Sequence, residues 1–248
     1  MASSKRLGII KSVIATFSKE RPLSSLELRR AGVSRELAYY YVKSGWLKRL
    51  ERGAFALEGG ELSQDGCLEF LNARFPGLHI GGKTALSWRG LIHNVPFQET
   101  LCLWGPKGGR IPVWFRDRFP CRYTSRQLFE QPIMQTTAIS SLPDKHGKVT
   151  VSEPERALLE LLSEVGTHQE VGEARNIMEL LGSIRPESLI PLLIHCRQTK
   201  ASRLCVQWAE ELGLPWATQA AKAIKGVTGG ARWVRKLASG HTLILKGS

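Results

Sequence analysis

Residues 31–57, AGVSRELAYYYVKSGWLKRLERGAFAL, contain a turn, a helical pattern and a strand-like pattern in close succession. Ser34 is a favourable helix N-cap, and the apolar residues that follow it recur at the spacing of one helical face. After Gly45, apolar and basic residues alternate on both sides of Gly53, as in two short antiparallel strands joined by a turn. The stretch therefore predicts a helix over residues 35–45 followed by a two-stranded wing.

Two more helices are expected before this stretch. Residues 6–20, RLGIIKSVIATFSKE, place apolar side chains on one helical face and basic side chains on the other. Ser24 is placed to cap a short helix that stops at Gly32, with Leu26 and Leu28 as candidate core residues. Two helices joined by a tight turn form a helix-turn-helix, whose second helix enters the DNA major groove.

Basic and aromatic side chains of this unit form a candidate DNA-binding surface. The N-terminal residues of the second helix lie nearest the bases, so we expect Arg35 and Tyr39 there and the basic wing residues on phosphates. The candidate DNA-binding residues are Ser34, Arg35, Tyr39, Tyr40, Lys43, Lys48, Arg49 and Arg52. The alternative is an adaptor domain of the same fold that has no role in DNA binding.

The net charge of +13 is unevenly distributed along the 248 residues. Residues 1–58 hold 12 basic and 5 acidic side chains, and residues 212–248 hold 6 basic and no acidic ones. Residues 126–211 are acidic, with 9 basic and 12 acidic side chains. Basic ends favour a polyanionic partner, because clustered Lys and Arg release counterions from nucleic acid; charge retained for solubility is the alternative.

Composition argues against several other classes of protein. The five cysteines are scattered and include no C-x-x-C pair, which favours reduced thiols in a cytoplasmic protein over disulfides or a zinc site. No apolar run is long enough for a membrane span. The six histidines show no H-x-x-x-H pair and no serine lies in a nucleophile elbow, so we expect no catalytic residue, metal or cofactor.

Residues 76–86, PGLHIGGKTAL, fit the P-loop formula G-x-x-x-x-G-K-[ST]. In a P-loop a buried strand leads into a loop whose backbone N–H groups bind phosphate. Here a helical pattern ends at Pro76, and residues 78–80 are themselves strand-like. We expect a short strand, a glycine turn and a helix from near Thr84, with Lys83 as a candidate anion contact and a nucleotide-hydrolysing enzyme as the less favoured alternative.

The rest of the chain predicts a second domain of strands followed by helices. Strand-like LCLW, IPVWF and CRYTS in residues 99–125 predict a small, mainly antiparallel sheet. Ser152 and Glu155 have the spacing of a capping box, so Glu155 is expected to cap the helix ERALLELL. Later apolar patterns predict a helical array. Trp233, in the basic C-terminal segment, either contacts nucleic acid or completes a terminal hairpin or helix.

Several of these stretches together resemble one known family. Residues 32–34, 41–47 and 49–55 are similar to the N-terminal winged helix of AbiEi-family antitoxins. The resemblance continues through GGKTALSWRGL at 81–91 and VSEPERALLELL at 151–162, and more weakly to SGHTLILKGS at the C-terminus. It implies a type IV toxin–antitoxin system, in which the protein neutralises a nucleotidyltransferase-like toxin and represses its own operon, with direct contact to the toxin left open.

These observations together predict an α+β protein of two domains. Residues 1–58 are expected to form a winged helix-turn-helix that binds promoter DNA. Residues 59–248 are expected to form an α+β antitoxin domain with a small, mainly antiparallel sheet and a C-terminal helical array. A transcriptional regulator with a sensing domain and no toxin partner is the alternative function.

Overall fold

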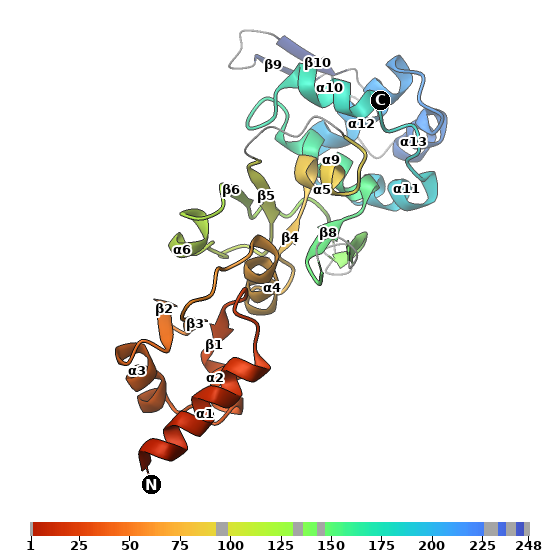
Figure 1. The fold of residues 1–248 in the computed structure, drawn as a ribbon. Helices are drawn as coiled ribbons and strands as arrows, with labels where there is room; N and C mark the ends of the chain where they lie inside the picture. Colours follow the sequence, from red (N-terminus) through yellow and green to blue (C-terminus); the bar gives the residue numbers. More distant parts are fainter. Residues whose placement is uncertain are drawn as a thin grey trace. The chain divides into compact units, whose positions relative to one another are not determined.

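The computed structural model describes residues 2–92, 99–130, 136–142, 147–225, 233–236 and 242–245. The chain divides into two compact units (Figure 1). The first unit comprises Met1–Pro76, Ile111–Phe119 and Leu142–Val149, and the second comprises Gly77–Arg110, Pro120–Ser141 and Thr150–Ser248. Both units combine helices with a small sheet, so the α+β class is confirmed.

The first unit begins with three helices and a three-stranded sheet. These elements are α1 (Ala2–Thr16), β1 (Leu23–Ser24), α2 (Ser25–Arg30), α3 (Arg35–Lys43), β2 (Leu47–Glu51) and β3 (Ala54–Leu57). Their apolar faces share one core, in which Ile10 and Val13 of α1 meet Leu28 of α2 and Tyr41 of α3. The order of helices, turn and hairpin is the one expected of a helix-turn-helix followed by a wing.

The sheet has the strand order β1-β3-β2, and both of its ladders are antiparallel. Gly53, with φ of 83°, makes the turn between β2 and β3, a conformation that side chains other than glycine rarely adopt. The two-stranded hairpin expected around Gly53 is confirmed. Strand β1 is only two residues long, and its pairing with β3, Leu23 opposite Phe55, has no periodic signal in the sequence.

The helix caps follow the sequence closely. Ser24 and Glu27 form a complete capping box at the start of α2, because each side chain accepts from the other residue's backbone N–H. Within α2, Leu28 is buried as expected, but Leu26 is 52% exposed, so its assignment to the core is wrong. The first helix ends at Thr16 rather than residue 20, because the Ser18 hydroxyl accepts from the Glu20 N–H and forms a local turn.

Two further helices complete the first unit, α4 (Gln64–Arg74) and α6 (Val113–Arg116). Helix α4 confirms the helical pattern before Pro76. The expectation of a strand at IPVWF is wrong, because Trp114 and Phe115 are adjacent and both buried, which a half-buried strand does not allow. The Trp114 ring meets Phe70 of α4 edge-on, with ring centroids 6.1 Å apart.

The second unit is built on a five-stranded sheet of order β6-β5-β4-β8-β7. Its strands are β4 (His79–Ile80), β5 (Leu101–Trp104), β6 (Cys121–Thr124), β7 (Ile139–Ser141) and β8 (Thr150–Ser152). The β5–β6 and β4–β8 ladders are parallel, and the β4–β5 and β7–β8 ladders are antiparallel. The sheet is therefore mixed rather than mainly antiparallel, because β4 and β8 are joined across a long stretch of chain and not by a hairpin.

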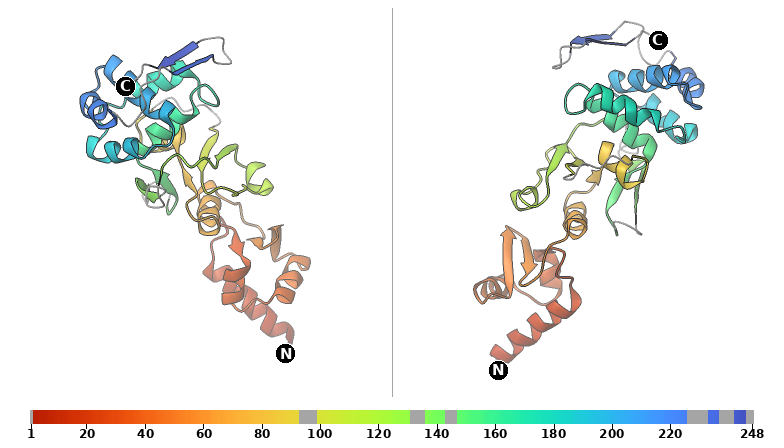
Figure 2. Two further views of the ribbon diagram at one scale, coloured as in Figure 1. Left: turned by 180° about the vertical axis from the view of Figure 1, so that it is seen from behind. Right: turned by 45° about the horizontal axis from the view of Figure 1, so that its top comes forward.

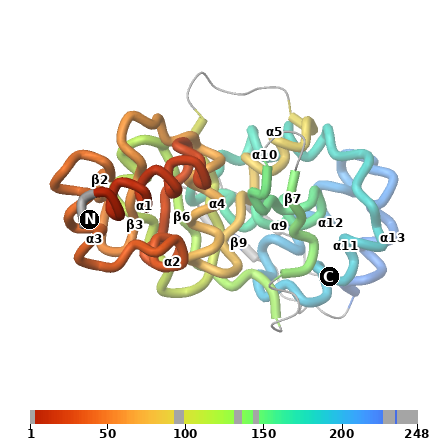
Figure 3. The backbone as a smooth tube through the Cα atoms, turned by 60° about the horizontal axis from the view of Figure 1, so that its bottom comes forward, coloured from red at the N-terminus to blue at the C-terminus, as the bar shows by residue number. Residues whose placement is uncertain are grey.

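Helices accompany this sheet and confirm the predicted helical array (Figure 2). They are α5 (Gly82–Trp88), α9 (Pro154–Glu164), α10 (Val171–Glu179), α11 (Pro186–Ile194), α12 (Thr199–Glu211) and α13 (Ala217–Ile224). The tube view of Figure 3 traces α13 beside α11 and α12, which it contacts. Strands β9 (Trp233–Lys236) and β10 (Thr242–Leu245) pair as an antiparallel hairpin.

Helix α9 is the centre of the array. It contacts α5, α10, α11 and α12, and every side chain from Glu155 to Glu164 is buried. Its start differs from the predicted capping box. The N-cap is Glu153, the Ser152 hydroxyl donates to Glu160, and Glu155 accepts from Arg185 instead of capping the helix.

Candidate nucleic-acid interface

The N-terminus of α3 is fixed by its cap. The Ser34 hydroxyl accepts from the Leu37 N–H at 3.2 Å and donates to the Glu36 carboxylate at 2.8 Å. The pKa of Glu36 lies below its ordinary value, because its own backbone N–H and the Ser34 hydroxyl donate to the carboxylate. This arrangement leaves Arg35, the first residue of α3, exposed at the end of the helix.

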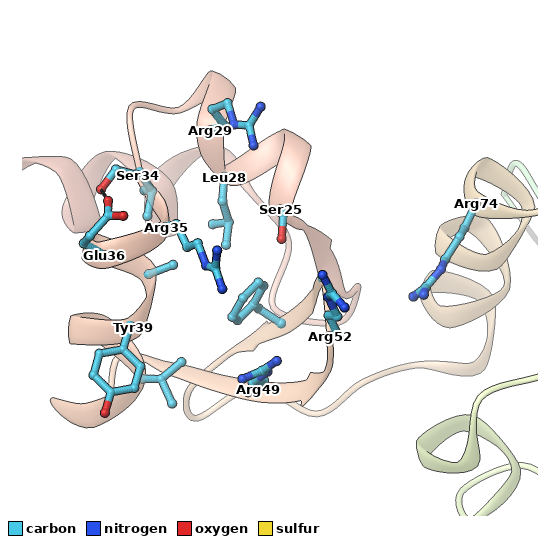
Figure 4. Close-up of a pocket in the computed structure, with 15 residues that line it drawn as sticks. Ser25, Leu28, Arg29, Ser34, Arg35, Glu36, Tyr39, Arg49, Arg52 and Arg74 are labelled. Carbon is cyan, nitrogen blue, oxygen red and sulfur yellow. Dashed lines mark hydrogen bonds between the residues drawn. The ribbon is translucent and has the colours of Figure 1, made fainter.

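A groove of about 1070 Å³ lies between α3 and the wing, all within the first unit (Figure 4). We call it the arginine groove. Elements α2, α3, β2, the β2–β3 turn, β3 and α4 all contribute to its lining. The lining residues are Ser25, Leu28, Arg29, Val33, Ser34, Arg35, Glu36, Ala38, Tyr39, Val42, Arg49, Arg52, Gly53, Phe55 and Arg74.

The arginine groove is strongly basic. Five arginines line it against a single acidic side chain, Glu36. Within the described part of the chain, the guanidinium groups of Arg29, Arg35 and Arg52 make no hydrogen bond or ion pair. Guanidinium groups that gather without internal anions provide a site for an external one, since each presents a fork of N–H donors that matches phosphate oxygens.

Apolar side chains form the rest of the lining and hold it in shape. Leu28, Val33 and Ala38 are buried in the core of the first unit, and Phe55 packs against that core. Arg49 donates from Nε to the Glu51 carbonyl at 3.4 Å, a long contact that ties it loosely to its own strand. Four of the five arginines therefore belong to helices or a strand, and Arg52 lies in the short turn between β2 and β3.

The structure brings five of the eight predicted DNA-binding residues together. Ser34, Arg35, Tyr39, Arg49 and Arg52 all line the arginine groove.

The other three predicted residues lie elsewhere on the first unit. Lys48 is next to Arg49 in β2 and so faces the opposite side of the strand, where it lines a second hollow of about 610 Å³ with Glu58 and Glu61. Tyr40 and Lys43 belong to α3 but are absent from the groove lining.

Both exposed tyrosines of α3 carry a cation against the ring. The Lys43 ammonium lies 4.9 Å from the centre of the Tyr39 ring, and the Arg6 guanidinium lies 4.9 Å from that of Tyr40. Tyr39 is 61% exposed and Tyr40 is 43% exposed. Tyr41, between them, is buried and donates its hydroxyl to the Arg6 carbonyl, so it supports the fold.

Four polar residues of the groove were missed by the sequence analysis: Ser25, Arg29, Glu36 and Arg74. Arg29 had a detectable signal, because it is a basic residue in the last turn of α2, the first helix of the predicted helix-turn-helix. Arg74 had none, since α4 lies outside the predicted motif and reaches the groove only through the tertiary fold.

The P-loop-like stretch adopts the strand, turn and helix that its sequence predicts, with the helix starting at Gly82 instead of near Thr84. The Gly82 N–H donates at 3.0 Å to the Glu160 carboxylate, so a side chain of the protein occupies the position that a phosphate would need. Lys83 forms an ion pair with Glu173. Its anion in this structure is thus an internal carboxylate.

Glu160 is the centre of a buried polar network in the second unit. It is fully buried and also accepts from the Ser152 hydroxyl at 2.9 Å and from Arg156 Nε at 2.8 Å. His79 Nε2 lies 2.9 Å from the Glu160 carboxylate, and its Nδ1 lies 2.9 Å from the Gly77 carbonyl.

The electrostatics of Glu160 follow from these partners. Burial acts to raise its pKa, but His79, Arg156 and the Gly82 N–H outweigh burial and hold the pKa below its ordinary value. The carboxylate is therefore ionised, as a structural ion within a satisfied network needs to be.

Metal-binding clusters, disulfides and membrane-spanning helices are absent from the described residues. They include no group of three or more His, Cys, Asp or Glu side chains arranged to hold a metal ion. None of the five cysteines, which all lie in the described part of the chain, forms a disulfide bond. No helix in the described part of the chain has the length and hydrophobicity that crossing a membrane requires.

Comparison with known families decides what kind of protein carries this groove. Residues 98–243 match the family described as transcriptional regulator, AbiEi antitoxin, of a type IV toxin–antitoxin system. The chain belongs to the AbiEi antitoxin family. Residues 7–97 match the N-terminal domain of the same AbiEi antitoxins, so the arginine groove lies wholly within the AbiEi N-terminal domain.

A solved structure shares the fold of this AbiEi protein. It is the crystal structure of the RV2827C protein from Mycobacterium tuberculosis, with a TM-score of 0.57 and 17% sequence identity. The alignment covers 90% of this chain and 80% of the other. At that identity the similarity concerns the fold alone. Among curated proteins, no sequence match to the AbiEi chain was found.

Proposed function

We propose that this AbiEi protein binds the promoter of its own operon through the arginine groove and represses transcription. The observation that carries the proposal is the set of three unpaired guanidinium groups, Arg29, Arg35 and Arg52, on a groove formed by α3 and the wing. Counterion release from the DNA backbone favours such a cluster over isolated surface arginines.

The proposed roles follow from position in the motif. Arg35 begins α3 and lies where a recognition helix presents side chains to base edges, so we assign it to bases, with Tyr39 one turn further on. Arg49 and Arg52 belong to the wing, and we assign them to phosphates. Ser34, Tyr40, Lys43 and Lys48 are retained as additional contacts at the edges of this surface.

We propose that residues 1–58 bind DNA and that residues 59–248 have the antitoxin activity. Support comes from the family of the chain, which is that of antitoxins of type IV systems. In this proposal the second part neutralises a nucleotidyltransferase-like toxin encoded next to it, in the cytoplasm. Neutralisation does not require a stable complex between the two proteins.

A footprint on the promoter of the protein's own operon tests DNA binding. The full chain should protect a defined site at low salt, and a double variant, Arg35→Ala with Arg52→Ala, should not. Both substituted side chains are exposed, so the variant is expected to fold normally. Absence of protection by the wild-type chain at low salt would contradict the proposal.

Growth assays test neutralisation separately. Expression of the neighbouring gene alone should stop growth, and co-expression of the full chain should restore it. The double variant should restore growth equally well while failing to repress a reporter driven by the promoter. If the wild-type chain does not restore growth, the antitoxin assignment is wrong whatever the footprint shows.

A further inference from the structure

The arginine groove extends beyond the helices and wing of the DNA-binding motif. Arg74, the last residue of α4, lines the groove and points toward Arg52 of the wing turn (Figure 4). Twenty-one residues of chain separate Arg52 from Arg74 in the sequence, so only the fold brings the two together. This adds a basic side chain from a fourth helix to a surface otherwise built from α2, α3 and the wing.

Arg74 is not an unpaired cation. Its guanidinium forms an ion pair with the Glu51 carboxylate of β2, and the side chains of Arg74 and Glu51 are 38% and 29% exposed. Its guanidinium also lies 5.6 Å from the centre of the Phe75 ring. A partly exposed ion pair adds little stability, because water screens it and two long side chains are ordered to make it.

Such a pair is easily exchanged for a better anion. A phosphate offers an arginine two oxygens in a bidentate arrangement, as a carboxylate does, and it arrives with neighbouring phosphates that attract the other arginines of the groove. In the complex, Glu51 would then be left near the DNA backbone and repel it. The two members of the pair therefore have opposite effects on DNA affinity.

We propose that Arg74 is a phosphate-binding residue of the DNA interface and that Glu51 acts as an internal competitor for it, which lowers DNA affinity. The inference rests on the proposed function, since it assumes that DNA occupies the arginine groove. It adds α4 to the interface and assigns Glu51 the role of competing with DNA phosphate for Arg74.

The competing account is that the pair only holds α4 against the wing. In that account either substitution would destabilise the first unit and weaken DNA binding. The two accounts predict opposite signs for Glu51→Gln, which removes the negative charge and keeps the shape of the side chain. Thermal unfolding of the same variants detects any loss of folding.

The test measures affinity of the full chain for its promoter fragment as a function of salt. The variants are Arg74→Ala and Glu51→Gln, with Arg30→Ala as a matched control, because Arg30 is exposed on α2 and does not line the groove. Loss of one phosphate contact should lower the salt slope by about one, so the wild-type advantage over Arg74→Ala shrinks about 3.5-fold between about 50 and about 200 mM salt.

Glu51→Gln should bind promoter DNA several-fold more tightly than the wild type, and Arg30→Ala should match the wild type. Weaker binding by Glu51→Gln, or an unchanged salt slope for Arg74→Ala, would overturn the inference. The proposed function would survive that result if Arg35→Ala still lost sequence preference. If the wild-type chain did not bind its promoter, both proposals would fail together.

Discussion

The Glu160 carboxylate accepts a hydrogen bond from the Gly82 backbone N–H at 3.0 Å, and so joins α9 to the start of α5. The two residues lie in the stretches GGKTAL and SEPERALLELL, 78 positions apart in the sequence. Both stretches are therefore explained by one buried contact. The glycine pair lets the backbone approach the carboxylate, and the helix provides that carboxylate together with Arg156.

Gly81 is the first position where this contact can be tested. A Cβ atom at Gly81 would lie 2.5 Å from Trp104 Cδ1 and closer still to the Glu160 carboxylate. Gly81→Ala should therefore lower the free energy of unfolding by about 2 kcal/mol. Gly182→Ala is the matched control, since a Cβ there meets no atom within 4 Å and should cost less than about 0.5 kcal/mol. Chemical denaturation of both variants checks this, and equal stabilities would contradict the packing account.

Glu160→Gln should lower the free energy of unfolding more than Gly81→Ala does. The substitution removes the carboxylate charge that buried Arg156 pairs with and that His79 contacts, which costs about 3 kcal/mol or more. The measurement is again denaturant unfolding at neutral pH. A Glu160→Gln variant as stable as the wild type would show that the charge of Glu160 adds nothing to the stability of the fold.

Protonation of the Glu160 carboxylate should make the stability of the fold depend on pH in the acid range. The pKa of Glu160 is lower in the folded chain than the ordinary 4.5. The ionised carboxylate therefore adds to the free energy of unfolding above pH 4.5, and this stabilisation is lost as the pH falls through the lower folded pKa. Wild-type stability should therefore fall below about pH 4.5 more steeply than that of Glu160→Gln. Parallel acid-unfolding curves for the two proteins would contradict this assignment.

Nucleotide binding should be absent. The Gly82 N–H already donates to Glu160, and Lys83 is paired with Glu173, so a phosphate would have to displace two carboxylates. We expect neither the wild type nor Lys83→Ala to bind ATP or GTP in titration calorimetry. Lysine-dependent binding or hydrolysis would restore the P-loop interpretation.

The wing offers a matched pair of basic residues on one strand. Arg49 lines the arginine groove, whereas Lys48 lines the hollow next to Glu58 and Glu61. Arg49→Ala should weaken binding to all DNA and lower the salt slope by about one, and Lys48→Ala should have the smaller effect. Titrations with promoter and unrelated duplexes measure both. A larger effect of Lys48→Ala would mean that DNA approaches the other side of the wing.

Local signals account for what the sequence predicted well. The caps at Ser24 and Ser34 and the alternation around Gly53 are set by residues within a few positions, so the helices and wing followed from them. The strand predicted at IPVWF failed, because a short apolar run has no clear period and its packing on Phe70 decided in favour of a helix.

The candidate site was predictable only in part for the same reason. Arg35, Arg49 and Arg52 belong to the motif itself and were found, whereas Arg74 and its partner Glu51 depend on where α4 lies in the first unit. The Glu160 network was hidden likewise, because His79 of β4 and Gly82 of α5 meet Glu160 of α9 only through the tertiary fold. Contacts between distant residues leave no periodic trace in a single sequence.

The central claim is that the arginine groove reads the operon's promoter with Arg35 at the bases. The most direct test is the ratio of affinities for the promoter fragment and a scrambled duplex of equal length, at one fixed salt concentration, for the wild type and Arg35→Ala. We predict a large ratio for the wild type and, for Arg35→Ala, a ratio reduced by about tenfold or more, which corresponds to one lost base contact. An unchanged ratio in a folded Arg35→Ala protein would contradict the account.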